Sequence, residues 1–570
     1  MNRQNLSRWL LACAFLSYLS QLYWFGRRGI HQIAIDDTDY LGIARHIRNH
    51  QFHAAIQDFR SPLISWIVAA GSFFCKDYVL IGKVVGIGSF VLAAALLYVF
   101  TNNLWRSPLV ASLAVLCFSL SRGLAAAAVG MVAPDFLLTT LVLCYFIALL
   151  GCLRRDEKRI WVLVGCIHAL AFLAKAVALP WLAVCTANAV LTAHPWRHWP
   201  SRLALAGIIP LVVAGTWAGV LDSKYGVFTT GTQFRVNYFQ WVDKSVHRDR
   251  GKYLVLRDTR PTLDEYGVND PMPPGSPAWH YPIQAKAAVT GLLANEVENL
   301  PRAIKETTIL ATPGGVLLFC LVVVQMIRRR SEKTAEFAIT IAILGGIVSV
   351  IVAYCSLVFD GRYVYPVVPL LLAVGMGLFG GPADMATRAV KYTAASLIIL
   401  GATASAVYPS SPFRKLDRDF QIPCYQAGAI LRAYSGRGQT IASVGRGPYQ
   451  GHGVGWEAGY KAAYFGDHWL IGVADELPDS ASTAELLQDI TKANPIAILV
   501  WGQRSDPRYS SLLDELTLRT AFVSTEVISD PSLGEVGSVA FRRKSQETIA
   551  LRQCPKSDEA PRSRRQNHSD

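Results

Sequence analysis

The chain has 570 residues, of which 52% are apolar and 17% charged, and its mean hydropathy is +0.29. Soluble chains carry about 25% charged residues. The composition and its long uncharged runs therefore exclude a soluble enzyme, a disordered protein and a disulfide-stapled secreted scaffold. The net charge of +14 is better explained by Lys and Arg in cytoplasmic loops than by nucleic-acid binding. We predict a polytopic α-helical membrane protein with soluble parts.

The first apolar run, roughly 9–25, follows two arginines and lacks a convincing cleavage site, so we expect an uncleaved first helix. Ten further runs are candidate spans: 79–101, 107–121, 133–152, 160–174, 176–193, 202–221, 308–327, 335–357, 363–380 and 388–408. The shorter run Pro62 to Phe74 is expected to lie along the membrane surface. The sequence thus predicts about eleven transmembrane helices.

Basic clusters at 154–159, 197–202, 328–333 and 388–391 set the expected orientation. If these clusters are cytoplasmic, the loop 27–78, the long loop 222–306 and the region after residue 408 share the outer face. We therefore expect a multi-pass protein of a bacterial inner membrane whose soluble parts face the periplasm. The predicted domains are a transmembrane catalytic domain, a soluble extracytoplasmic domain and a disordered tail, over residues 1–408, 409–543 and 544–570.

The region after residue 408 alternates short β-rich runs with helical patterns, from TIASVG at 440–445 to VGSVAFRR at 536–543. Such alternation is typical of a small α/β sheet domain. The glycine-rich stretch at 445–455 follows a predicted strand. It lacks the spacing and the downstream acid of a nucleotide fingerprint, so we interpret it as a loop.

Three carboxylates, Asp36, Asp37 and Asp39, lie in the motif DDTDY, which ends at Tyr40 beyond the first helix. Acids this close repel one another unless a cation, a metal or a proton relieves the repulsion. A helix cap formed by Asp36, Asp37 or Thr38 would account for one acid and not for three. We therefore expect a catalytic or ligand-binding role for this motif at the membrane surface.

Several charged residues lie on the predicted outer side, where the positive-inside rule does not expect cations. They are Arg60 in FRSPL, Arg122, Asp135 in APDF, Lys175 in FLAKAVALP and Arg362 in DGRYVYPVVP. Arginine binds phosphate through a planar fork of donors, and a misplaced cation usually has an anionic partner. Simpler explanations stay open: a snorkelling Arg60, a dipole role for Asp135, or a wrongly assigned topology.

His46, His50 and His53 follow the acids at helical spacing, with His31 before them. Such a helix face can bind a metal ion, although it is more often simply polar. We assign no metal ligands and no cofactor, and a divalent metal is left as an open alternative.

Together these motifs resemble those of the GT-C-fold glycosyltransferases that use lipid-phosphate sugars, over about residues 8–380. The shared pattern is an acid pair and tyrosine after the first helix, then R/K-x-P-L, P-D at a helix start, L-x-K-x, and R-Y-x-x-P-x-x-P in a late helix. The bacterial aminoarabinose transferases of lipid A and the protein O-mannosyltransferases are the most similar in pattern.

The resemblance implies that Asp36 is the catalytic base, that Asp37 is the second acid of the pair and that Asp135 lies near the site. It implies that the donor phosphate and its carrier lipid lie near Arg60, Arg362 and Tyr363, and we add Lys175 as a phosphate ligand. Additional candidates are Asp39, Tyr40 and Arg122. Asp39 stands where the aminoarabinose enzymes carry a basic residue. The C-terminal region also differs from the β-trefoil-type module of eukaryotic protein mannosyltransferases, and both departures leave the acceptor open.

The functional hypothesis is an inverting transfer of a sugar from a polyprenyl-phosphate donor to a glycolipid, polysaccharide or protein on the periplasmic face. The main alternative is a transporter or flippase for a lipid-linked sugar. Another surface-acting transferase and a non-catalytic assembly factor also stay open. Transporters usually show internal repeats and midplane charges, whereas the acids here are predicted at one surface.

Overall fold

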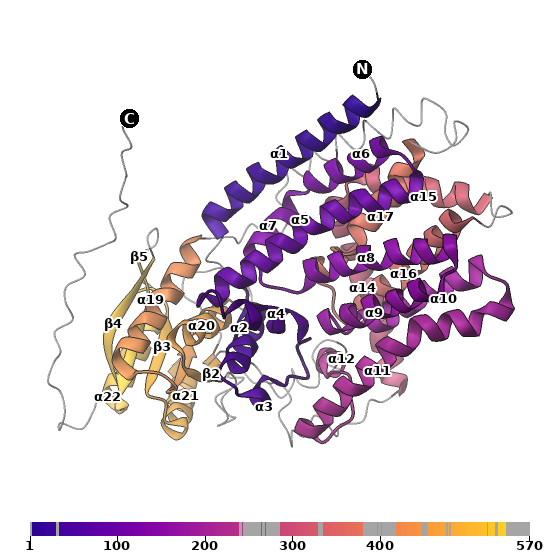
Figure 1. The fold of residues 1–570 in the computed structure, drawn as a ribbon. Coiled ribbons are helices and arrows are strands. Elements are labelled where there is room, and N and C mark those ends of the chain that lie inside the picture. Colours follow the sequence, from indigo (N-terminus) through magenta and orange to yellow (C-terminus); the bar gives the residue numbers. More distant parts are fainter. Residues whose placement is uncertain are drawn as a thin grey trace.

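A computed structural model of the chain describes residues 3–29, 33–238, 285–328, 334–379, 418–445, 454–474, 480–520, 522–530 and 534–542, with single positions 242, 264, 268, 396, 401 and 477. Figure 1 shows a helical part, residues 3–379, and a C-terminal sheet domain, residues 418–542. Most of the predicted span 388–408, most of the glycine-rich stretch and the tail 544–570 lie outside the described residues.

The helical part begins with one long helix and three shorter ones that follow it. Its helices are α1 (Arg3–Gly29), α2 (Ile35–Arg48), α3 (Phe52–Ala55), α4 (Leu63–Gly71), α5 (Tyr78–Trp105), α6 (Pro108–Ser119), α7 (Arg122–Gly130), α8 (Asp135–Arg155), α9 (Lys158–Ala174), α10 (Ala178–Ala193), α11 (Trp199–Tyr225), α12 (Gln233–Asn237), α14 (Ala285–Ala311), α15 (Pro313–Arg328), α16 (Ala335–Leu357) and α17 (Val367–Gly375). Short 3-10 turns add η1 (Trp196–His198), η5 (Gly361–Val364) and η6 (Met376–Phe379).

Four helices of the described chain are long and apolar enough to cross a membrane: α5, α8, α11 with its preceding turn, and α16. The bent pairs α6–α7 and α14–α15 would raise this number to six if each pair is one span, and α10 and α17–η6 are shorter apolar helices. The four long helices match the positions of predicted apolar runs, which places the chain in a membrane. α14 instead lies mostly within 222–306, which the sequence predicted as a loop. The total of eleven spans stays a prediction.

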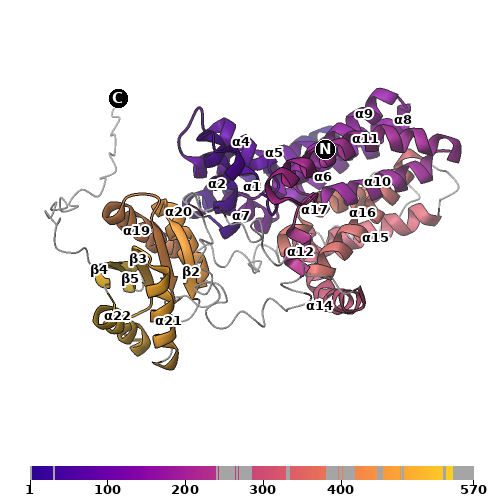
Figure 2. The same ribbon diagram turned by 90° about the horizontal axis from the view of Figure 1, so that it is seen from below.

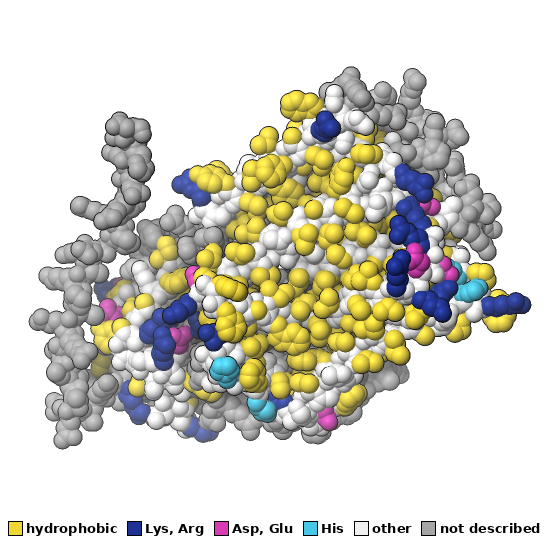
Figure 3. Space-filling model, viewed as in Figure 1, with side chains coloured by type: hydrophobic (Ala, Val, Ile, Leu, Met, Phe, Trp, Pro, Cys, Tyr) yellow, Lys and Arg dark blue, Asp and Glu magenta, His cyan; other side chains and the backbone are white. Residues whose placement is uncertain are grey.

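α4 has nine residues, or about 14 Å of helix, so it cannot cross a hydrocarbon core of about 30 Å. α8 has 21 residues, or about 32 Å, which matches that thickness. Asp135 opens α8, and the basic segment 154–159 joins its other end to α9. Figure 3 shows a broad apolar belt with Lys and Arg side chains at two opposite borders. One of these borders lies beside the C-terminal domain.

The C-terminal domain is a five-stranded mixed sheet of order β2-β1-β3-β5-β4. Its strands are β1 (Thr440–Val444), β2 (Trp469–Ala474), β3 (Ala497–Trp501), β4 (Phe522–Asp530) and β5 (Gly534–Arg542). β1 pairs in parallel with β2 and β3, and β5 is antiparallel to β3 and β4. This confirms the predicted small α/β domain.

Helices cover both faces of this sheet, as the view from below shows (Figure 2). They are α19 (Arg418–Ser435), α20 (Val454–Gly466), α21 (Ser480–Ala493) and α22 (Pro507–Arg519). One apolar core contains Leu41 of α2, Val68 of α4 and Tyr460 of α20 together with strand residues. The C-terminal domain is therefore packed against α4 and against α2, which carries the DDTDY motif.

Candidate functional site

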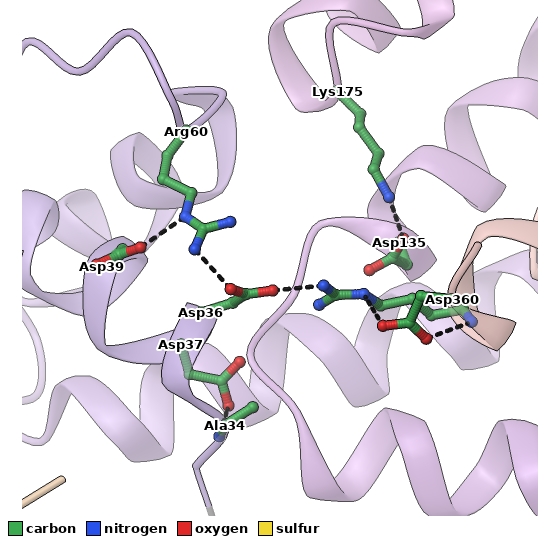
Figure 4. Close-up of polar contacts among 9 residues, drawn as sticks. Ala34, Asp36, Asp37, Asp39, Arg60, Asp135, Lys175 and Asp360 are labelled. Carbon is green, nitrogen blue, oxygen red and sulfur yellow. Dashed lines mark hydrogen bonds and ion pairs between the residues drawn. The ribbon is translucent and has the colours of Figure 1, made fainter. Parts of the chain in front are cut away.

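Helix α2 directs the neighbouring acids of the DDTDY motif to different partners. The backbone N–H of Ala34, the N-cap residue, donates to Asp37 Oδ2 at 2.8 Å. Asp37 is fully buried. Burial raises the pKa of this carboxyl, and the nearby Lys83 ammonium and backbone N–H groups offset only part of that rise. Helix capping thus explains Asp37, whose carboxyl is turned away from the arginines (Figure 4).

Asp36 lies between two arginines that come from distant parts of the chain (Figure 4). Its Oδ1 is 2.5 Å from Arg60 Nη2, and its Oδ2 is 2.5 Å from Arg362 Nη2. Arg60 belongs to the segment before α4, and Arg362 to η5. Burial alone would raise the pKa of Asp36, but the two guanidinium groups outweigh it and hold this pKa well below its usual range.

Two further carboxylates complete the cluster. Arg60 Nε is 2.6 Å from Asp39 Oδ2, and Asp39 is fully buried. Arg362 Nε is 3.1 Å from Asp360 Oδ2. We call Asp36, Asp39, Arg60, Asp360 and Arg362 the Asp36 cluster. Each arginine is held by two carboxylates, so its guanidinium plane is fixed before any ligand arrives.

A separate ion pair joins two helix ends beside this cluster. Lys175 Nζ is 2.6 Å from Asp135 Oδ1, and both side chains are largely buried. Lys175 occupies the break between α9 and α10, and Asp135 begins α8 after Pro134. Lys175 Nζ also lies 4.5 Å from the centroid of the Tyr363 ring, next to Arg362. The pair therefore brings a third cation, beside Arg60 and Arg362, to the same end of the bundle.

A mostly apolar cavity of about 500 Å³ begins at Arg60. Its wall includes Phe172 before the α9–α10 break, Leu179 of α10, Trp217 of α11 and Leu292 of α14. The N–H of Ala176 donates to Ser61 Oγ at 3.2 Å, which ties the Arg60 segment to that break. The wall of the cavity thus contains the buried Arg60 guanidinium together with side chains of apolar helices.

The structure brings most of the predicted site residues together. Tyr40 is buried, and the Arg60 guanidinium carbon lies 5.7 Å from its ring centroid. Arg122 instead begins α7, is exposed, and lies 6.0 Å from the ring centroid of Phe25. It takes no part in the ion pairs of the Asp36 cluster described above.

Sequence reasoning missed two members of this region. Asp360 stands two positions before Arg362 in the motif DGRYVYPVVP, so its place in this motif could have identified it as a site residue. Tyr354 stacks on Tyr363 with ring centroids 4.0 Å apart. It lies inside an apolar run, and nothing near it in the sequence marks it as a site residue.

The histidines lie apart from these contacts. His46 Nδ1 bonds Gln51 Oε1 at 2.8 Å, and His46 Nε2 is 2.5 Å from Asp264 Oδ2. His50 and His53 are exposed, and His31 lies outside the described residues. Within the part of the chain that the structure describes, no three His, Cys, Asp or Glu residues are grouped to hold a metal ion.

No protein-family model and no curated protein sequence matches the chain. Solved structures share its fold. ArnT from Cupriavidus metallidurans bound to undecaprenyl phosphate matches with a TM-score of 0.50 and 12% identity, over 93% of this chain and 97% of that chain. Its apo state matches with a TM-score of 0.51 and 12% identity, over 93% and 96%.

The Archaeoglobus fulgidus oligosaccharyltransferase in complex with Zn and sulfate matches with a TM-score of 0.51 and 10% identity, over 86% of this chain and 68% of that chain. At these identities the likeness establishes the fold. It confirms the GT-C-like architecture that the motifs predict.

Proposed function

We propose that the chain is an integral membrane glycosyltransferase that moves a sugar from a polyprenyl-phosphate donor to an acceptor of the cell envelope. The observation that carries this proposal is the convergence of Arg60 and Arg362 on Asp36, together with the mostly apolar cavity that Arg60 also lines. A donor of this class has a matching shape, because its anionic phosphate is joined to a long apolar chain. The fold supports the proposal, since one neighbour was solved with undecaprenyl phosphate and another is an oligosaccharyltransferase.

The donor phosphate takes the place that the Asp36 carboxylate occupies between the two guanidinium groups. Planar arginine donors bind a phosphate oxygen pair as they bind a carboxylate. The first prenyl units extend into the cavity past Leu179 and Trp217. Each buried CH₂ group contributes about 0.8 kcal/mol to this binding, so the lipid supplies affinity and the arginines supply position.

Displacement of Asp36 by the phosphate also creates the base. Without the guanidinium groups on both oxygens, the Asp36 carboxylate accepts the proton of the acceptor hydroxyl. The acceptor oxygen forms a bond to the anomeric carbon, and the bond from that carbon to the phosphate oxygen breaks. The electron pair leaves with polyprenyl phosphate, whose growing charge Arg60 and Arg362 stabilise. A single displacement of this kind inverts the anomeric centre.

Lys175 supplies a third cation for the leaving phosphate. Asp135 holds Lys175 Nζ in position at 2.6 Å, and the stacked Tyr354 and Tyr363 rings form the adjoining wall. We assign Asp135 and Asp37 positioning roles. Asp135 acts through Lys175, and Asp37 fixes the first turn of α2 that carries Asp36.

We infer that the reaction occurs on the periplasmic face of a bacterial inner membrane. The Asp36 cluster lies near the end of α8 that begins at Asp135, and the basic segment 154–159 lies at the other end of that helix. Basic segments of this kind are retained in the cytoplasm. A glycolipid, a polysaccharide and a protein all fit the proposed acceptor class.

The test compares cell envelopes from strains that express wild type, Asp36→Asn or Asp514→Asn at matched levels with a deletion strain. Asp514 is an exposed acid on α22, so its substitution is the matched control. Mass spectrometry of lipids, glycans and glycoproteins should show a sugar-sized mass shift with wild type and Asp514→Asn only. If Asp36→Asn restores the wild-type envelope, the catalytic assignment fails and transport or scaffolding becomes the explanation.

A further inference from the structure

A second, basic pocket lies on the outer side of the molecule, between α2, the segment that joins α4 to α5, and the C-terminal domain. Its volume is about 660 Å³. Four cationic side chains, Arg45, Arg48, Lys76 and Arg437, line it together with one carboxylate, Asp467. Four cations against one acid give this lining a net charge of +3, and we call it the basic pocket.

Asp467 is shared by several arginines and cannot neutralise the pocket. Its Oδ1 is 2.8 Å from Arg45 Nη1, and its Oδ2 is 3.3 Å from Arg437 Nε and 3.4 Å from Arg432 Nη2. A carboxylate carries one negative charge, so three guanidinium groups around it leave positive charge uncompensated. The pocket is therefore built to receive an anion.

Arg48 and Lys76 supply the cations that this carboxylate does not reach. Among the described residues, neither side chain makes an ion pair. The Arg48 guanidinium carbon lies 4.4 Å from the ring centroid of Phe73, so the aromatic ring holds the group while its N–H donors stay available. Lys76 is exposed.

Exposed aromatic side chains place the pocket at the membrane surface. Phe73 and Phe74 are 69% and 94% exposed, and they lie just before α5, one of the four membrane-length helices. Exposed Phe side chains beside basic residues are typical of segments that insert at the boundary between lipid headgroups and acyl chains. Figure 3 shows Lys and Arg side chains beside the C-terminal domain, next to the apolar belt.

We propose that the basic pocket binds the phosphate of an anionic lipid headgroup, with Phe73 and Phe74 inserted among the acyl chains. Lipid bound in this way joins the membrane surface to both α2 and the C-terminal domain, since Arg48 belongs to the former and Arg437 to the latter. Arg45 and Arg48 lie about 14 and 18 Å along α2 from Asp36, so this site is distinct from the Asp36 cluster. The proposal is independent of sugar transfer and is tested by binding alone.

The experiment measures lipid binding to the purified full-length protein in detergent by native mass spectrometry. The probes are phosphatidylglycerol, phosphatidylcholine with the same acyl chains, and inorganic phosphate as a competitor. The test variant is Arg48→Gln with Lys76→Gln, and a second variant is Phe73→Ser with Phe74→Ser. The matched control, Arg504→Gln with Arg519→Gln, removes the same number of cationic side chains, from two exposed arginines of the C-terminal domain that do not line the pocket.

Wild type and control should prefer phosphatidylglycerol to phosphatidylcholine. The Arg48/Lys76 variant should bind phosphatidylglycerol about 25-fold more weakly, from the usual contribution of two basic residues at an anionic surface. The Phe73/Phe74 variant should weaken lipid binding and leave competition by inorganic phosphate unchanged. Equal binding of phosphatidylglycerol by the test and control variants would overturn the assignment of the basic pocket as a lipid site. Competition by inorganic phosphate that is as strong as that by lipid would overturn the lipid as its ligand and assign a soluble phosphate instead.

Discussion

At the scale of single residues, one helical step separates two acids that look equivalent in the sequence. Consecutive side chains of a helix point about 100° apart. Asp36 therefore reaches Arg60 and Arg362, whereas Asp37 turns back to the N–H of Ala34. The sequence predicted that three acids this close need a cation, a metal or a proton to relieve their repulsion. It could not predict which acid meets Arg362, because that contact depends on the folded chain.

We expect Asp36→Asn to lower kcat/KM for sugar transfer by about 10²- to 10⁴-fold, the usual contribution of a general base. Asp37→Asn should stay within about tenfold of wild type, because an amide oxygen still accepts the Ala34 N–H. Turnover of a polyprenyl-phosphate sugar by purified variants measures both effects. Equal losses in the two variants would contradict the separate roles.

The pH dependence of transfer should report the release of Asp36 from the arginines. In the free protein the pKa of Asp36 is depressed, so the carboxylate stays ionised and kcat/KM, which reports free enzyme, should keep its activity far into acid. Bound donor phosphate engages both guanidinium groups and brings negative charge, so the pKa of Asp36 rises. The acid limb of kcat should therefore lie at higher pH than that of kcat/KM. Coincident limbs, or the reverse order, would show that donor phosphate does not replace Asp36.

At the scale of elements, the sequence predicted strands with a regular apolar pattern and missed elements whose pattern is interrupted. The strands β1 and β5 lie where the runs TIASVG at 440–445 and VGSVAFRR at 536–543 predicted them. β4 was missed because Thr525 is skipped in its pairing with β5, and this extra residue interrupts the alternation of the strand. α19 was missed because it contains Pro423, which usually ends a helix.

The break between α9 and α10 places Lys175 at the site and also opens the cavity, so a change there should act on the donor lipid. Leu179→Trp should raise KM for the donor by about 15-fold, because the loss of about two buried CH₂ contacts costs about 1.6 kcal/mol. kcat should change little, since Leu179 is an apolar side chain in the wall of the cavity and makes none of the ion pairs of the Asp36 cluster. Steady-state kinetics with donors of different prenyl length measure this. Leu179→Met is the volume-conserving control, and a fall in kcat at constant KM would contradict the lipid path.

At the scale of the whole molecule, the fold gathers charged segments from five places at one end of the bundle. These segments are the starts of α2 and α8, the Arg60 segment, the α9–α10 break and η5. The opposite end of α8 carries its own pair, with Arg202 Nη2 2.5 Å from Asp156 Oδ2. The sequence predicted both groups and their separation by one span. Their assembly into one site depends on helix packing, which no local pattern encodes.

This separation predicts the sidedness of the protein, which single cysteines at each end can test. Arg519→Cys lies on α22 of the C-terminal domain, and Arg159→Cys lies in the basic segment after α8; both side chains are exposed, at 63% and 84%. A membrane-impermeant polyethylene-glycol maleimide, added to cells with a permeabilised outer membrane, should shift the Arg519→Cys protein on a gel beyond the wild-type band. The Arg159→Cys protein should shift only after lysis. The wild-type chain controls for its native cysteines. Labelling of Arg159→Cys in intact cells would reverse the topology and place the Asp36 cluster in the cytoplasm, where nucleotide sugars would compete as donors.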